Sequence, residues 1–196
     1  MLDSILADRD LIVDMVKVST MLVVSRLLIG GDLSNEAWMK GSVYTLMGFA
    51  SYHVLTKKVV NNTMDDPVKK RVLNTWLKVG TMLTVSRMLS GEELNEKWMM
   101  ESVYTILGFN TFDAIVLDLL PLDGIKNETV KSIVIDTVNV VTMSTVSALL
   151  AGKKLDEPWA LSTLNTCVGF AVYNLVTRSE EHTSELQSRQ YLVCRL

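Results

Sequence analysis

Cysteine, histidine and proline are scarce in this chain, and their scarcity excludes several classes of protein. The 196 residues include two cysteines, two histidines and three prolines. So few cysteines cannot build a disulfide-rich domain. We also find no glycine-rich phosphate loop and no HExxH motif. The sequence therefore predicts no catalytic residues, no metal and no cofactor, and we expect that the protein is not an enzyme.

A strong charge of one sign is also missing. Lysine and arginine total 19 against 22 aspartate and glutamate residues, which gives a formal net charge of −3. No basic run with interleaved aromatic residues occurs, so the sequence predicts no nucleic-acid partner. Residues 1–10 are acidic and lack the basic segment that begins a cleaved signal peptide.

The last residues, 178–196, are interpreted as foreign to the protein. Codon by codon they match the translation of a common short-read sequencing adapter, with an index sequence at residues 189–191. All of them match in a single frame, so we treat this segment as a library artefact and predict a disordered tail. Cys167 and His53 are then the only cysteine and histidine that remain, so neither an intrachain disulfide nor a Cys/His metal cluster can form.

What the chain does contain is an internal repeat. A pattern of one serine, one glycine, one tryptophan and a later Gly-Phe pair occurs three times, at an offset of about 61 residues. The matching residues are Ser25, Gly30, Trp38 and Gly48, then Ser86, Gly91, Trp98 and Gly108, then Ser147, Gly152, Trp159 and Gly169. We therefore divide the chain into repeats at 1–60, 61–122 and 123–177, followed by the tail at 178–196.

Each repeat is predicted to be a hairpin of two helices. No segment shows sustained alternation with a period of two, so the expected fold class is all-α. The first helices are expected at 10–29, 68–90 and 128–151, and the second helices at 36–58, 96–119 and 157–177. A glycine that can end the first helix is followed in each repeat by a residue that can cap the second helix, namely Asn35, Asn95 or Asp156.

The apolar character of these helices favours a six-helix membrane bundle. Residues 41–56 and 160–177 contain no Asp, Glu, Lys or Arg, and about 20 apolar residues span a bilayer. Trp38, Trp98 and Trp159 begin the second helices, where interfacial anchors are expected. The first connection between repeats is rich in lysine and the first two hairpin loops are acidic, which predicts cytoplasmic connections, although the second connection and Lys153 do not fit this pattern. The other helices carry charges, so a soluble helical-repeat binding module is an alternative.

Two lines of residues are candidates for function or for helix packing. The first helices carry polar residues on one equivalent face, namely Asp14, Lys17 and Ser25, then Lys78 and Ser86, then Asp136, Asn139 and Ser147. In lipid this polar stripe must face protein or water. It either lines a pathway between the odd-numbered helices, as in a small channel or transporter, or joins helices by ion pairs and hydrogen bonds. The second helices carry Gly48, Gly108 and Gly169, expected at close helix contacts, and beside them His53, Asp113 and Asn174.

The segment 78–91, together with Trp98 and residues 104–109, resembles small multi-pass membrane proteins encoded by large DNA viruses of algae and protists. The resemblance covers most of residues 10–177 and includes no motif that defines an activity. It implies a protein of the internal membrane of the virion. We therefore expect a multi-pass integral membrane protein with a structural or interaction role, whose partners are the lipid bilayer, further copies of the chain or viral structural proteins.

Overall fold

The computed structural model describes residues 9–55 and 66–193, and the side chains of residues 10–54 and 66–177. Within these residues all regular structure is helical, which confirms the all-α fold class. The first helices of the repeats are α2 (Arg9–Leu28), α5 (Pro67–Leu89) and α8 (Glu128–Leu150), and the second helices are α3 (Glu36–Leu55), α6 (Glu96–Thr111) and α9 (Glu157–Val193). In the second repeat α6 continues through a π-helical turn, η1 (Phe112–Val116), into α7 (Leu117–Leu119), and a 3-10 turn, η2 (Leu122–Gly124), precedes α8.

The turns of the three hairpins share one construction. Their first helices end before a glycine with positive φ, at 68°, 72° and 65° for Gly30, Gly91 and Gly152. Glycine adopts this left-handed conformation without the steric cost of a Cβ atom. The second helices begin at a side-chain cap, in which Asn35, Asn95 or Asp156 accepts a hydrogen bond from the amide of the following tryptophan, at 2.9, 2.9 and 3.2 Å.

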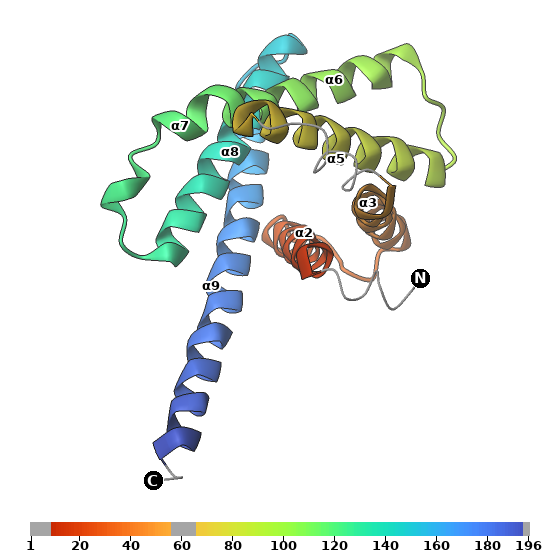
Figure 1. Ribbon diagram of the computed structural model, residues 1–196. Coiled ribbons are helices and arrows are strands. Elements are labelled where there is room, and N and C mark those ends of the chain that lie inside the picture. Colours follow the sequence, from red (N-terminus) through yellow and green to blue (C-terminus); the bar gives the residue numbers. More distant parts are fainter. Residues whose placement is uncertain (1–8, 56–65, 194–196) are drawn as a thin grey trace.

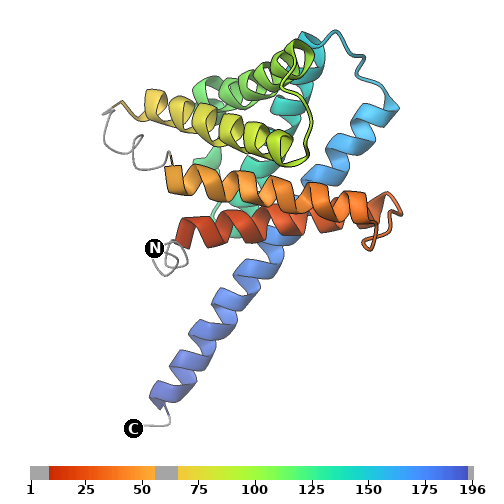
Figure 2. The same ribbon diagram turned by 90° about the vertical axis from the view of Figure 1, so that its right-hand side faces the viewer.

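The six long helices of the described chain form a closed ring in chain order. Each helix packs on the next one along the chain, and α9 returns to α2 and closes the ring (Figure 1). In Figure 2 the three hairpin turns lie toward the right-hand side, whereas the start of α2 and the end of α9 lie toward the left. The hairpin turns therefore share one side of the ring.

The contacts between repeats are centred on one glycine and one methionine. A Cβ atom added to the glycine would lie 2.6 to 2.9 Å from the methionine carbonyl oxygen, and the pairs are Gly48 with Met82, Gly108 with Met143, and Gly169 with Met21. Backbones approach this closely only where a side chain is absent. The same kind of contact joins the first hairpin to the second, the second to the third, and the third back to the first.

Two helices differ from the prediction. The helix expected at 96–119 is interrupted by the π-helical turn η1, which corresponds to one residue inserted into a helix and leaves little trace in the sequence periodicity. The helix α9 continues past residue 177 to Val193, so the backbone at 178–193 is helical and the prediction of a disordered tail is wrong there. This segment contains neither glycine nor proline, and its Glu, Gln, Leu and Arg residues readily extend an existing helix.

Truncation after Thr177 is expected to leave the stability of the ring unchanged. In Figures 1 and 2 the end of α9 extends away from the other helices, so its removal should change the free energy of unfolding by less than about 1 kcal/mol, the size of a typical single-site effect. Unfolding of the full and truncated chains by heat or denaturant measures this difference. A truncated chain that is destabilised by more than this amount would show that residues 178–196 belong to the native fold.

Thiol labelling gives a second prediction for the same segment. Cys167 is 7% exposed inside α9 and should react slowly with a thiol reagent. Cys194 lies outside the described residues, and because we interpret its segment as foreign to the fold, we expect it to react quickly. Equal, slow labelling of both cysteines would contradict this expectation.

Candidate functional site

The polar stripe is divided among the three contacts between repeats. The helix register assigns three equivalent positions to each contact: a polar residue of a first helix, the residue five positions after the crossing glycine of the same repeat, and the residue four positions before the crossing methionine of the next repeat. Hydrogen bonds and ion pairs join all three positions at the first and third contacts, and join Thr75 to Asp113 at the second. We call these sets cluster one (Asp14, His53, Lys78), cluster two (Thr75, Asp113, Asn139) and cluster three (Asp136, Asn174, Lys17).

Asp14 is the centre of cluster one. One of its carboxylate oxygens lies 2.6 Å from Nζ of Lys78 and 2.8 Å from Nε2 of His53. His53 is buried, with 8% of its surface exposed, whereas Asp14 and Lys78 are half-buried. The Lys78 ammonium also lies 5.7 Å from the ring centroid of Phe49, within range of a cation–π interaction. Cluster one therefore joins α2, α3 and α5 through a single carboxylate.

Cluster three repeats this arrangement where the ring closes. The Asp136 carboxylate pairs with Nζ of Lys17 at 2.6 Å and accepts a hydrogen bond from Nδ2 of Asn174 at 2.8 Å. Lys17 also lies 5.2 Å from the ring centroid of Phe170 and 6.0 Å from that of Tyr173. Asn174 is 5% exposed, so the pair is held at a largely buried position. This cluster links α8 and α9 of the third repeat to α2 of the first.

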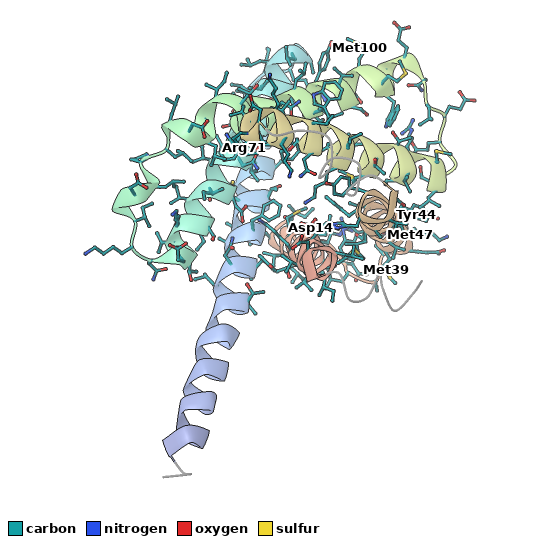
Figure 3. All side chains as sticks on the ribbon, in the orientation of Figure 1. Asp14, Met39, Tyr44, Met47, Arg71 and Met100 are labelled. Atoms are coloured by element: carbon teal, nitrogen blue, oxygen red, sulfur yellow. The ribbon has the colours of Figure 1, made fainter. Side chains whose placement is uncertain are left out.

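Cluster two differs because it contains no lysine. The Thr75 hydroxyl donates to the Asp113 carboxylate at the first turn of η1. Arg71 does not contact that carboxylate; its guanidinium donates to the backbone carbonyl of Asp113 at 3.1 Å and to the Asp118 carboxylate at 3.0 Å. The Oδ1 atom of Asn139 is buried and accepts no hydrogen bond. Figure 3 shows Arg71 at the start of α5 and Asp14 on α2.

The remaining serines of the stripe lie nearer the hairpin turns. The Ser25 hydroxyl donates across a helix contact to the carbonyl oxygen of Asn165 at 3.1 Å. Ser86 and Ser147 line cavities of about 430 and 240 Å³, and within the described side chains neither hydroxyl makes a hydrogen bond. Only one of the three serines therefore joins two helices.

The predicted interfacial tryptophans all lie half-buried in the first turn of a second helix. Trp38 and Trp98 line the same cavity of about 430 Å³ beside α5. Trp159 donates from its indole nitrogen to the carbonyl oxygen of Ser144 at 3.3 Å. The structure thus places them at the end of the ring that carries the hairpin turns.

Two arginines outside the predicted site hold the hairpin turns in place. Nε of Arg26 donates to the Asp32 carbonyl oxygen at 3.3 Å, and Nε of Arg87 donates to the Glu93 carbonyl oxygen at 3.2 Å. The Asp32 carboxylate in turn accepts hydrogen bonds from the Ser34 hydroxyl and amide at 2.7 and 2.8 Å, which lower the pKa of that carboxyl. Arg26 and Arg87 occupy matching positions in the first two repeats, and this recurrence is the sequence signal for their role in the turns.

Half-open cavities of about 700 and 610 Å³ border clusters one and three, respectively. The acids in both clusters are already paired with lysines. Within the side chains that the structure describes, no group of three or more His, Cys, Asp or Glu residues could hold a metal ion. The geometry is therefore that of charge-neutralised helix contacts, in which each carboxylate ties together helices from two repeats.

The outer surface of the ring exposes many large apolar side chains. Large hydrophobic residues with more than 40% of their surface exposed occur on several helices and include Met39, Met47, Met100, Val141, Leu161 and Leu164. Figure 3 shows Met39 and Met47 on α3, and Met100 on α6, pointing away from the rest of the ring. Polar clusters inside and apolar side chains outside are the reverse of the arrangement of a typical water-soluble domain.

Two helices are long and apolar enough to cross a membrane, Glu96–Leu119 and Glu128–Leu150. The sequence predicts six spanning helices, but within the described residues only two helices meet this criterion of length and composition. The first helices α2 and α5 carry several charges. The helix α3 contains Ser, Thr and Tyr, and α9 contains these and Asn, which lowers the hydropathy of both. Lys57 and Lys58, on which the predicted cytoplasmic side depends, lie outside the described residues.

Comparison of the chain with protein families, with curated proteins and with solved structures finds no match.

Proposed function

We propose that this chain is an integral membrane protein with a structural role, whose ring of hairpins presents its outer surface to lipid. The observation that carries this proposal is the combination of an apolar exterior with ion pairs inside the ring. Soluble monomers rarely expose apolar patches larger than a few hundred Å². Ionisable groups within membrane helices, in contrast, face the protein interior and pair with one another, as Asp14 and Lys78 do.

The burial of the two candidate spans supports the same proposal. Only 22% of the apolar window in Glu96–Leu119 and 11% of that in Glu128–Leu150 is buried in the fold. An apolar helix in the core of a soluble protein would be mostly buried by its neighbours. Most residues of α8 are instead only partly covered by the fold, and an acyl-chain environment would cover the apolar surface that stays exposed.

The pairing of charges supports a structural role over a transport pathway. Asp14 is neutralised by Lys78, and Asp136 by Lys17, so these positions tie repeats together instead of offering free charges to a permeating ion. The resemblance of segment 78–91 to membrane proteins of large DNA viruses extends the proposal to a location in the internal membrane of a virion, where neighbouring copies or viral structural proteins are the partners.

Alkaline carbonate extraction of membranes that contain the expressed full chain tests membrane insertion. Carbonate at high pH strips peripheral proteins but leaves inserted helices in the bilayer, so we expect nearly all of the chain in the membrane pellet and its release only by detergent. A chain that passes into the carbonate supernatant, and that purifies as a monodisperse species without detergent, would favour the soluble binding module instead.

A further inference from the structure

The half-open cavities beside clusters one and three, which we call cavity one and cavity three, are built from equivalent positions. Their volumes are about 700 and 610 Å³. Aligned on the crossing glycines and methionines, the lining residues match in pairs: Asp14 with Asp136, Tyr52 with Tyr173, His53 with Asn174, and Lys78 with Lys17. The same feature of the fold therefore occurs once where repeat one meets repeat two and once where the ring closes.

The two cavities differ in charge. Five charged residues line cavity one, namely the cations Lys70, Arg71 and Lys78 and the acids Asp10 and Asp14. Among the described residues that line cavity three, the charged ones are Lys17 and Asp136, which pair with each other. With His53 neutral, three positive and two negative charges leave cavity one with a net charge of +1, whereas cavity three is neutral. Cavity one is therefore the one suited to an anion.

Lys70 and Arg71, at the start of α5, carry donors that the fold does not use. Lys70 is half-buried, and its ammonium makes no ion pair or hydrogen bond with the residues that the structure describes. The Nε and Nη2 atoms of Arg71 donate to the Asp113 carbonyl oxygen, and Nη2 also to the Asp118 carboxylate. The described residues supply no acceptor for Nη1 of Arg71. Both cations can therefore donate to an anion in cavity one.

Asn74 adds an uncharged donor to the same wall of cavity one. Its Oδ1 atom accepts a hydrogen bond from the Tyr52 hydroxyl, and its amide Nδ2 has no acceptor among the described residues. Asn74 follows Lys70 by one helical turn, so the two side chains lie on one face of α5. The equivalent residue in cavity three is Val13, which offers no polar group. An ammonium, a guanidinium and an amide thus line cavity one together.

We propose that cavity one binds the phosphate group of an anionic phospholipid, with Lys70, Arg71 and Asn74 as its donors. Lysine and arginine both bind phosphate, and basic pockets between membrane helices bind anionic headgroups. The start of α5 lies on the side of the ring away from the hairpin turns (Figure 2), which is at headgroup level if the ring spans a bilayer, so this inference rests on the proposed function. Val13 lines cavity one and is 41% exposed, so the cavity opens beside apolar surface that acyl chains can cover.

Titration of the purified full chain with phosphatidic acid in micelles of an uncharged detergent tests this proposal. Native mass spectrometry counts the bound lipid, and phosphatidylcholine, whose headgroup has a phosphate but no net charge, is the comparison. One lysine or arginine near anionic lipid strengthens binding about fivefold. With two such residues, we expect a dissociation constant about 20-fold lower for phosphatidic acid than for phosphatidylcholine. Equal dissociation constants for the two lipids would overturn the proposal.

Lys70→Gln assigns the lipid preference to cavity one, and Lys131→Gln is its matched control. Lys131 is the equivalent residue of α8, is also half-buried, and lines neither cavity. We expect Lys70→Gln to weaken the binding of phosphatidic acid about fivefold, and Lys70→Arg and Lys131→Gln to leave it unchanged. Equal losses in the Lys70→Gln and Lys131→Gln variants would overturn the proposal, because any lysine at the start of a helix would then serve.

Inorganic phosphate distinguishes a lipid headgroup from a free anion. A large excess of phosphate should displace little phosphatidic acid, because the acyl chains add contacts that the free anion lacks. Displacement by phosphate at a concentration equal to that of the lipid would assign the cavity to the free anion and overturn the lipid proposal. The titration in micelles requires no bilayer. A chain that resists carbonate extraction but does not prefer phosphatidic acid would therefore overturn this inference alone and leave the membrane proposal standing.

Discussion

Gly108→Ala is expected to destabilise the ring by about 1–3 kcal/mol, the usual cost of forcing extra atoms into a packed contact. The added Cβ would lie 2.6 Å from the carbonyl oxygen of Met143 and 2.8 Å from its Cα, so the backbones of α6 and α8 must separate. Because the clash is with backbone, no side-chain rotation can relieve it. Equilibrium unfolding of the purified chain measures the loss, and a similar loss is expected for Gly48→Ala and Gly169→Ala, whose added Cβ atoms would meet methionine backbone at 2.6 and 2.9 Å.

Gly80→Ala is the matched control for this prediction. Gly80 also lies within a helix, but a Cβ there would meet only Cδ1 of Ile106 at 3.7 Å, an ordinary van der Waals distance. Removing a glycine from a helix interior should then stabilise the chain by up to about 1 kcal/mol. If Gly80→Ala and Gly108→Ala changed stability in the same direction and by the same amount, the close contact at Gly108 would be contradicted.

Asp136→Leu is expected to destabilise the ring by about 2–3 kcal/mol, because it leaves the Lys17 ammonium without its counter-charge. The side chains of Lys17 and Asp136 are 27% and 14% exposed, so water compensates only part of the loss. Asn174 would lose its acceptor on Asp136 at the same time. The free energy of unfolding of this variant, measured as for the glycine variants, gives the size of the effect.

The double variant Lys17→Met, Asp136→Leu separates a structural from a transport role. Replacing both partners of a buried ion pair by apolar residues often leaves stability unchanged. We therefore expect the free energy of unfolding of the double variant to lie within about 1 kcal/mol of that of the unmodified chain. It should still fractionate with membranes. A well-folded double variant that has lost an ion flux shown by the unmodified chain in liposomes would instead favour the channel or transporter.

The hairpin turns could be predicted from the sequence because each feature occurs three times. The left-handed glycine and the following cap recur at matching places in every repeat, and both depend on local backbone geometry alone. The close contacts of Gly48, Gly108 and Gly169 could likewise be expected from their recurrence, although their partner methionines could not.

The pairing of charges could not be derived in the same way. From helical spacing, Asp14 could pair with Lys17 on its own helix or with Lys78 on another, and the choice depends on which repeats become neighbours in the ring. The structure pairs Asp14 with Lys78 and leaves Lys17 for Asp136 across the closure between α9 and α2. Non-local contacts of this kind depend on the order of the helices around the ring, which no local pattern records.

A spin label at Val141 tests most directly whether the outer surface of the ring faces lipid. Val141 lies within the candidate span α8 and is 41% exposed, and Leu94 in a hairpin turn is a matched control at 44%. Each would be replaced by cysteine in a chain whose two native cysteines are serine, and the labelled protein would be reconstituted in liposomes. We predict that the Val141→Cys label collides more often with oxygen, which concentrates in lipid, than with a water-soluble nickel complex, and that the Leu94→Cys label shows the reverse. A Val141→Cys label as accessible to the nickel complex as the Leu94→Cys label would contradict a membrane-embedded ring.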